Sequence, residues 1–360
     1  VGVERCRNLT DTPLRYEPYF GIGSPRARAG AAGLAVRKRQ NGGGVPRPLS
    51  EIEALTRPGA GGRAEPSTLA DMTEALRKSL ADEPATDQQP DCLVRRAIRH
   101  SLGAPGKLVR GQLVLLTVSA WGCPWRPALE FARAVEIVHA SSLVIDDLPA
   151  MDNAALRRGT ATVHRVHGEA TAILAAVAML AQAFEAIAGA EVSAEARVMA
   201  TEALSRSVGP DGMTGGQQLD LAGVGNSKEE IATVHGMKTG ALFAAAAEIG
   251  TIAAGIDGPR RWLMSDFGML LGKAFQEFDD LADRYGSTES MGKDTGKDED
   301  KATMVAVMGG KAAERHALEQ VVLALECLHA SGARETDLEV FALDLVGKLR
   351  ARYLLPASEA

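Results

Sequence analysis

Residues 141–152 read SSLVIDDLPAMD, and residues 272–285 read GKAFQEFDDLADRY. Each stretch places a cluster of aspartates in an apolar, helix-prone context. Carboxylates are costly to remove from water unless a cation lies between them. Two such clusters on facing helices would form a site for hard divalent cations, and magnesium commonly binds together with phosphates. The pair of clusters is therefore the main clue to both fold and function.

The composition around these clusters favours helices. The chain has 360 residues, 46% of them hydrophobic and only 4% aromatic. Ala and Leu dominate its middle and C-terminal parts, and both are strong helix formers, whereas strands prefer β-branched and aromatic residues. Apolar positions recur at three-to-four spacing over long runs. We predict an all-α fold, a bundle of about ten helices that begins near residue 67.

Charge and cysteine content narrow the class of protein. The formal net charge of −6 argues against a general nucleic-acid surface. The four cysteines are far apart and lack metal-ligand spacing, as expected for isolated thiols in a reducing compartment, so we predict a cytoplasmic protein. The most apolar run, 170–190, is interrupted by Gln182 and Glu185. We therefore predict no membrane span and interpret this run as a helix buried inside the bundle.

Residues 1–65 differ from the rest of the chain. They are rich in Gly, Arg and Pro and show no sustained period, so we predict a disordered or non-native N-terminal extension. Their excess of basic residues superficially suggests a transit peptide. The first methionine is Met72, which leaves open an over-early start. We assign the helical domain to residues 66–356.

The spacing within each cluster predicts its geometry. Asp279 and Asp283 are four residues apart and share one helix face. Pro149 should end the first helix, so that the chain can bring Asp152 back towards Asp146. A single cluster of this kind is more often a solvated helix face. Two clusters in apolar contexts favour a metal site instead.

Basic residues near the clusters suggest phosphate binding. Arg157 and Arg158 follow the first cluster, and guanidinium groups suit multidentate phosphate contacts. Lys107 and Arg110, one helical turn apart in GKLVRG, can converge on one anion. Further cations are Lys238 in GMKTG and Lys293 in MGKD. Together they predict two diphosphate sites, one bound through magnesium and one by side-chain cations alone.

With these clusters and cations, the chain resembles the trans-isoprenyl diphosphate synthases, in particular the bacterial geranylgeranyl diphosphate synthase type. The resemblance runs from about residue 100 to residue 310. It rests on motifs in the order found in that family: GKLVR, HASSLVIDDLPAMDNAALRRG, GGQQLDL, KTGALF, FQEFDDLAD, and GKD followed by DKAT.

The resemblance implies the isoprenoid synthase fold, a bundle of helices around a deep central cavity, usually as a homodimer. It implies two or three Mg²⁺ ions, with allylic diphosphate and isopentenyl diphosphate as substrates. It assigns metal binding to Asp146, Asp147, Asp152, Asp279, Asp280 and Asp283. It assigns the allylic diphosphate to Arg157, Lys238 and Lys293, and isopentenyl diphosphate to Lys107, Arg110, His139 and Arg158. Gln276 and Thr239 would face the developing cation, with Gln217 and Asp220 in support. The catalytic set is then Asp146, Asp152, Asp279, Lys238 and Gln276.

Three positions depart from the commonest family pattern. Leu108 stands where a second basic residue is frequent, Ile145 where His is common, and Val177 where many members carry Asp. None removes an assigned phosphate ligand. His139 on an apolar helix would ordinarily be structural, but its place two turns before Asp146 matches the family's diphosphate-binding His, so we favour the functional interpretation.

Ser141 and Ser142 bear on product length. They lie five and four residues before Asp146, where bulky aromatic residues in the family block elongation at the farnesyl stage. Two small residues leave room for a C20 product, although side chains of other helices at the deep end of the cavity could limit the product to a shorter chain. The leading hypothesis is a geranylgeranyl diphosphate synthase, and the nearest alternative is a farnesyl diphosphate synthase. Two more distant alternatives are a class I terpene cyclase and a catalytically silent regulatory subunit. A cyclase needs no second diphosphate site, so the residues Lys107, Arg110, His139 and Arg158 argue against it. A silent subunit tends to lose its metal-binding aspartates, and here both clusters are complete.

Overall fold

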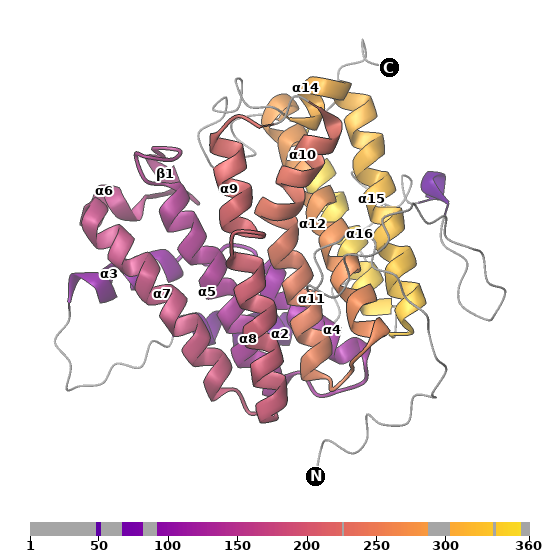
Figure 1. Ribbon diagram of the computed structural model, residues 1–360, viewed down its shortest axis with the longest axis horizontal. Coiled ribbons are helices and arrows are strands. Elements are labelled where there is room, and N and C mark those ends of the chain that lie inside the picture. Colours follow the sequence, from indigo (N-terminus) through magenta and orange to yellow (C-terminus); the bar gives the residue numbers. More distant parts are fainter. Residues whose placement is uncertain are drawn as a thin grey trace.

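The computed structural model describes residues 48–51, 67–81, 92–224, 227–286, 303–333 and 336–353. Apart from 48–51, the predicted extension 1–65 lies outside the described residues, and the predicted domain boundaries stay predictions. Within these ranges the chain is almost wholly helical (Figure 1), as predicted.

The helices follow one another through short connections. Their bounds are α2 Ser67–Ala81, α3 Leu93–Leu102, α4 Val109–Ala120, η2 Arg126–Ala128, α5 Leu129–Asp146, α6 Val163–His167, α7 Glu169–Gly189, α8 Ala194–Val208, α9 Met213–Leu221, α10 Lys228–His235, η3 Gly236–Gly240, α11 Ala241–Ala253, α12 Pro259–Tyr285, α14 Met304–Met308, α15 Gly310–Ser331 and α16 Thr336–Arg350. These are more helices than the ten or so predicted, because short segments such as α6 and α14 leave little periodic signal.

A β-hairpin whose strands have two residues each was not predicted from the sequence. Strands β1 (Leu156–Arg157) and β2 (Thr160–Ala161) pair antiparallel, with Leu156 opposite Ala161. Arg158 and Gly159 form the turn with φ of 53° and 78°. Positive φ at both central residues is typical of tight hairpin turns. Strands of two residues are too short to show an alternating pattern.

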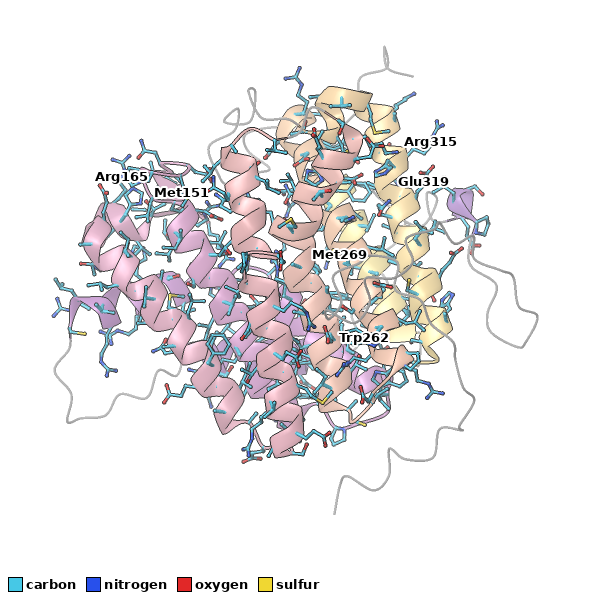
Figure 2. The ribbon with its side chains drawn as sticks, in the orientation of Figure 1. Met151, Arg165, Trp262, Met269, Arg315 and Glu319 are labelled. Atoms are coloured by element: carbon cyan, nitrogen blue, oxygen red, sulfur yellow. The ribbon has the colours of Figure 1, made fainter. Side chains whose placement is uncertain are left out.

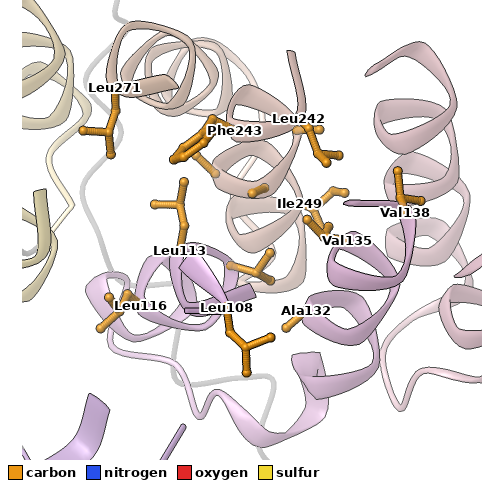
Figure 3. Close-up of a cluster of buried hydrophobic side chains, with 14 of the residues drawn as sticks. Leu108, Leu113, Leu116, Ala132, Val135, Val138, Leu242, Phe243, Ile249 and Leu271 are labelled. Carbon is orange, nitrogen blue, oxygen red and sulfur yellow. The ribbon is translucent and has the colours of Figure 1, made fainter. Parts of the chain in front are cut away.

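The core lies between α4, α5, α11 and α12. Figure 3 shows Leu113 of α4, Val135 of α5 and Phe243 of α11 around a common apolar centre, and all three side chains are fully buried. Helices α11 and α12 approach closely. A Cβ at Gly268 of α12 would lie 2.4 Å from the carbonyl oxygen of Phe243, and one at Gly272 would lie 2.8 Å from Cα of Gly240. Glycine at these two positions is therefore required for the contact.

Helix α7 contains the apolar run predicted to be buried. By length and composition it is the one described helix that could span a membrane, and 39% of its most apolar window is buried. One face packs on α5, while Ile173, Leu174 and Val177 are 46%, 57% and 61% exposed. The prediction that this helix is buried inside the bundle is therefore wrong, because periodicity cannot distinguish a buried helix from one that leaves an apolar face exposed.

The cysteines agree only in part with the prediction of isolated thiols. Cys92 and Cys327 are free. Cys123 is disulfide-bonded, contrary to that prediction. The cytoplasmic location stays a prediction.

Candidate functional site

The structure contains a cavity of about 1370 Å³ that is partly open to solvent and is walled by α5, α9, η3, α12 and the loop after α5. Figure 2 shows Met151 of this loop at the hairpin end of the molecule, far from Trp262 near the start of α12. Most of the predicted site residues line the cavity: Arg110, His139, Ser141, Ser142, Asp146, Asp152, Arg157, Gln217, Lys238, Thr239, Gln276, Asp279, Asp280 and Asp283. Lys107, Asp147, Arg158 and Asp220 lie off its wall, and Lys293 lies outside the described residues.

The first aspartate cluster is built as the spacing predicts. Helix α5 ends at Asp146, and the backbone N–H of Asp152 donates to the carbonyl of Asp146 at 2.9 Å. Burial raises the pKa of Asp146 to about 6; Asp152 adds to this shift, while Lys238 opposes it. The negative end of the helix dipole adds to the same local charge. The site therefore has excess negative potential, which a bound cation would relieve.

Asp147 has a different environment from its neighbour. Its side chain is nearly buried, and Arg157 donates to its Oδ1 from Nε at 3.0 Å. This pair holds the guanidinium of Arg157, a residue that lines the cavity. The structure thus places Asp147 behind Arg157 rather than among the residues that line the cavity.

The second cluster lines the cavity, and one of its members also joins a hydrogen-bond network along the wall. Asp279 and Asp283 line the cavity from one face of α12. Asp280 accepts from Nε2 of Gln276 at 2.9 Å, and the Oε1 of Gln276 accepts from the Thr239 hydroxyl at 2.7 Å. These contacts fix the orientation of Gln276 and Thr239 at the cavity wall.

His235 completes this network and was missed in the sequence. Its Nε2 lies 3.3 Å from Oδ2 of Asp280. Burial opposes protonation of His235, but the neighbouring Asp280 carboxylate, which shares a hydrogen bond with it, raises its pKa. The position of His235 three residues before Lys238, on the same helix face, was the available signal.

A π-helical turn presents Lys238 and Thr239. The segment η3 lies between α10 and α11, and such turns are frequent at functional sites. Lys238 forms an ion pair with Asp220 of α9. A Cβ at Gly216 would lie 2.3 Å from the backbone N of Lys238, so glycine allows α9 to approach η3. The predicted supporting role of Asp220 has a geometric basis in this pair.

Arginines and a histidine gather on the α4–α5 side. Arg110 is buried, and its guanidinium carbon lies 4.6 Å from the ring centroid of Phe243. Burial lowers the pKa of Arg110 to about 10, which leaves it charged at neutral pH. Burial also lowers the pKa of His139 well below its usual value, and the charges of Arg110 and Arg158 act in the same direction. His139 is therefore neutral beside permanent cations.

Lys107 does not join this group. Burial lowers its pKa, and the charges that affect it most are those of Arg352 and Lys348, followed by Asp279. Arg352 itself lies 3.5 Å from Oδ1 of Asp279. The end of the α16 region therefore contributes cations beside the second cluster, and sequence reasoning missed this because the contact joins distant parts of the chain.

The carboxylates fit magnesium as one part of its coordination shell. In the described ranges no three His, Cys, Asp or Glu side chains lie close enough to hold a metal ion by themselves. Magnesium typically takes one or two carboxylates and completes its shell with water and phosphate oxygens. The lining carboxylates Asp146, Asp152, Asp279 and Asp283 supply that kind of partial site on facing walls.

Comparison with known proteins gives one consistent result. Residues 91–336 match the polyprenyl synthetase family. A geranylgeranyl diphosphate synthase from Pantoea ananas is 40% identical over 268 residues, which cover 73% of this chain and 86% of the relative. A farnesyl diphosphate synthase from Geobacillus stearothermophilus is 38% identical over 222 residues, covering 60% and 75%. The crystal structure of a Helicobacter pylori geranyltransferase complexed with magnesium and isoprenyl diphosphate has a TM-score of 0.70 at 27% identity, covering 80% of this chain and 99% of that one.

The metal-and-phosphate hypothesis predicts a change in thermal stability. Mg²⁺ added to a mixture of protein and inorganic diphosphate should raise Tm above the value with diphosphate and EDTA, because ligands that bind the folded state stabilise it. Asp146→Asn should remove most of this additional rise. Asp211→Asn, an exposed aspartate outside the cavity, is the matched control and should keep it. An undiminished rise in Asp146→Asn would contradict the metal role of the first cluster.

Proposed function

The chain belongs to the polyprenyl synthetase family and is a prenyltransferase, and we propose that it condenses isopentenyl diphosphate with an allylic diphosphate to give geranylgeranyl diphosphate. The observation that carries this proposal is the cavity itself. Carboxylates suited to magnesium line one part of its wall, while Arg110 and His139 offer a second, metal-free anion site.

The residues would divide the chemistry as follows. Magnesium, when bound, would neutralise charge on the departing diphosphate; Asp146, Asp152 and Asp279 would hold it, and two or three ions are expected. Arg157 and Lys238 would bind the same diphosphate and so favour its departure. Thr239 and Gln276, oriented by their mutual hydrogen bond, would place oxygens beside the allylic cation.

Isopentenyl diphosphate must stay intact while its double bond attacks the allylic carbon. A site of permanent cations without metal suits this role, since it binds the diphosphate without promoting ionisation. Arg110 supplies the permanent charge from the cavity wall and neutral His139 a hydrogen-bonding group, with Arg158 just off the wall. The apolar residues of the cavity, such as Phe275 and Leu180, would exclude water from the cation.

Product length depends on the depth of this apolar part. Ser141 is buried, and its hydroxyl donates to the carbonyl of Ala176 on α7 at 3.0 Å. Ser142 also lines the cavity, and its hydroxyl donates to the carbonyl of His139. Two small side chains whose hydroxyls are satisfied leave the cavity open below Asp146, which favours C20 over C15.

The exposed face of α7 supports a homodimer. Ala170, Ile173, Leu174, Val177 and Ala181 form an exposed stripe along one side of the helix, and all five are apolar. Large apolar stripes on a protein surface commonly mark an interface. We propose that the same stripe of a second copy covers it, as in an isologous dimer.

The direct test of function is a condensation assay. Purified full-length protein with Mg²⁺ and isopentenyl diphosphate is given dimethylallyl, geranyl or farnesyl diphosphate, and product length is read by chromatography. We expect a C20 product from each primer. Asp279→Ala should lower turnover by about 100-fold or more with Tm retained, and Asp211→Asn should not. No condensation with any primer would overturn the prenyltransferase, and accumulation of C15 alone would support the farnesyl alternative.

Ser141→Phe should shorten the product to C15, because the ring would occupy the path of the growing chain. Ser142→Phe tests the same wall without disturbing the hydrogen bond to Ala176. Both variants are compared at equal folded concentration, checked by circular dichroism. An unchanged C20 product in both variants would show that other residues, for example Leu180, limit the length of the product.

Leu174→Glu combined with Val177→Glu should shift the protein from dimer to monomer in light scattering, because two buried charges would oppose association. Ala312→Glu is the control; it changes an exposed residue of α15, which lies at the other side of the molecule in Figure 1. A wild-type monomer at micromolar concentration, or an unchanged dimer in the double variant, would refute the α7 interface.

A further inference from the structure

Helix α4 begins without a conventional N-cap. Leu108 occupies the N-cap position with φ 54° and ψ 36°, and it makes no side-chain hydrogen bond to the first turn. This left-handed conformation is unfavourable for a residue with a Cβ. The first backbone N–H groups of a helix need acceptors from elsewhere when no cap supplies them.

Glu136 of α5 supplies the missing acceptor. The backbone N–H of Gly111 donates to Oε1 of Glu136 at 2.7 Å. The carboxylate also interacts favourably with the positive end of the α4 dipole. Glu136 is 4% exposed and does not line the cavity, so its contacts are with the protein alone.

Two glycines of GKLVRG make room for this arrangement. A Cβ at Gly111 would lie 2.9 Å from Cγ of Glu136 and 2.4 Å from Cδ2 of Leu76. A Cβ at Gly106 would lie 2.7 Å from the guanidinium carbon of Arg158. The segment is thus shaped so that α5 and the hairpin arginine both approach it closely.

The charges agree with this geometry. Burial raises the pKa of Glu136, and the hydrogen bond from Gly111 and the charges of Arg110 and Arg158 oppose that shift. Glu136 is therefore a buried negative charge near both guanidinium groups assigned to the metal-free anion site. A buried carboxylate is retained at low cost only where such partners surround it.

We propose that Glu136 is a positioning residue for the metal-free diphosphate site. It fixes the first turn of α4 through Gly111 and thereby holds Arg110 in place over Phe243. The inference rests on the proposed function for the identity of the ligand, isopentenyl diphosphate. Anion binding at this site can be measured without turnover, so the positioning role can be tested separately from the proposed function.

The kinetic test compares KM for isopentenyl diphosphate with KM for the allylic substrate. Glu136→Ala should raise KM for isopentenyl diphosphate by about tenfold, as expected for the loss of one charged hydrogen bond, with KM for the allylic substrate within about twofold. Glu136→Gln keeps an acceptor for Gly111 and should restore most of the affinity. If Glu136→Ala does not fold, Glu136→Asp, whose carboxylate is one methylene too short, replaces it and should show the same selective rise.

The matched control is Glu248 of α11, which is also 4% exposed and accepts two hydrogen bonds from Arg206. Glu248→Ala and Glu248→Gln should lower Tm without a selective change in either KM. Equal rises in both KM values for Glu136→Ala, or the same selective rise in the Glu248 variants, would overturn the positioning role.

A second readout needs no catalysis. In EDTA, inorganic diphosphate binding measured by calorimetry should weaken about tenfold in Glu136→Ala and be unchanged in Glu248→Gln. In an Arg110→Ala background, Glu136→Ala should cause no further loss, because it acts through that arginine. Additive losses would overturn the proposal. If the wild-type enzyme condensed no substrate while this pattern held, the proposed function would fail and the positioning role would stand.

Discussion

The structure depends on the burial of like charges at the ends of two long helices. Asp146 closes α5 and Asp279 lies near the end of α12, so the negative poles of both helices point into one cavity together with their carboxylates. Such an arrangement is unfavourable without cations. Much of the surrounding structure provides them, from Arg157 on the hairpin to Lys238 on η3 and Arg352 after α16.

The cationic residues are presented by short segments with unusual backbone conformations. Arg110 follows a left-handed Leu108, Arg158 occupies a hairpin turn at positive φ, and Lys238 lies in a π-helical turn. Arg110 and Lys238 line the cavity from these segments, and Arg158 lies just off its wall. The helices thus provide the rigid wall, and local departures from regularity set the direction of the charges.

The sequence predicted the helical class and most of the charged residues that line the cavity, because both follow from local patterns. The return of Asp152 to Asp146 was predictable from Pro149 and is observed. The direction of Asp147 was not, because it depends on Arg157 across a hairpin whose two-residue strands leave no periodic signal. The pairing of His235 with Asp280 likewise needs the relative placement of two helices, which no local pattern contains.

The π-helical turn η3 makes the length of its helix as important as its composition. A π turn contains one residue more than an α turn, so the extra residue bulges from a helix whose register is otherwise kept. Deleting one residue there would restore α-helical geometry and leave Phe243 in the contact where Gly268 and Gly272 receive α11. The backbone that presents Lys238 and Thr239 would change direction, so the extra residue matters for the cavity wall and not for the core.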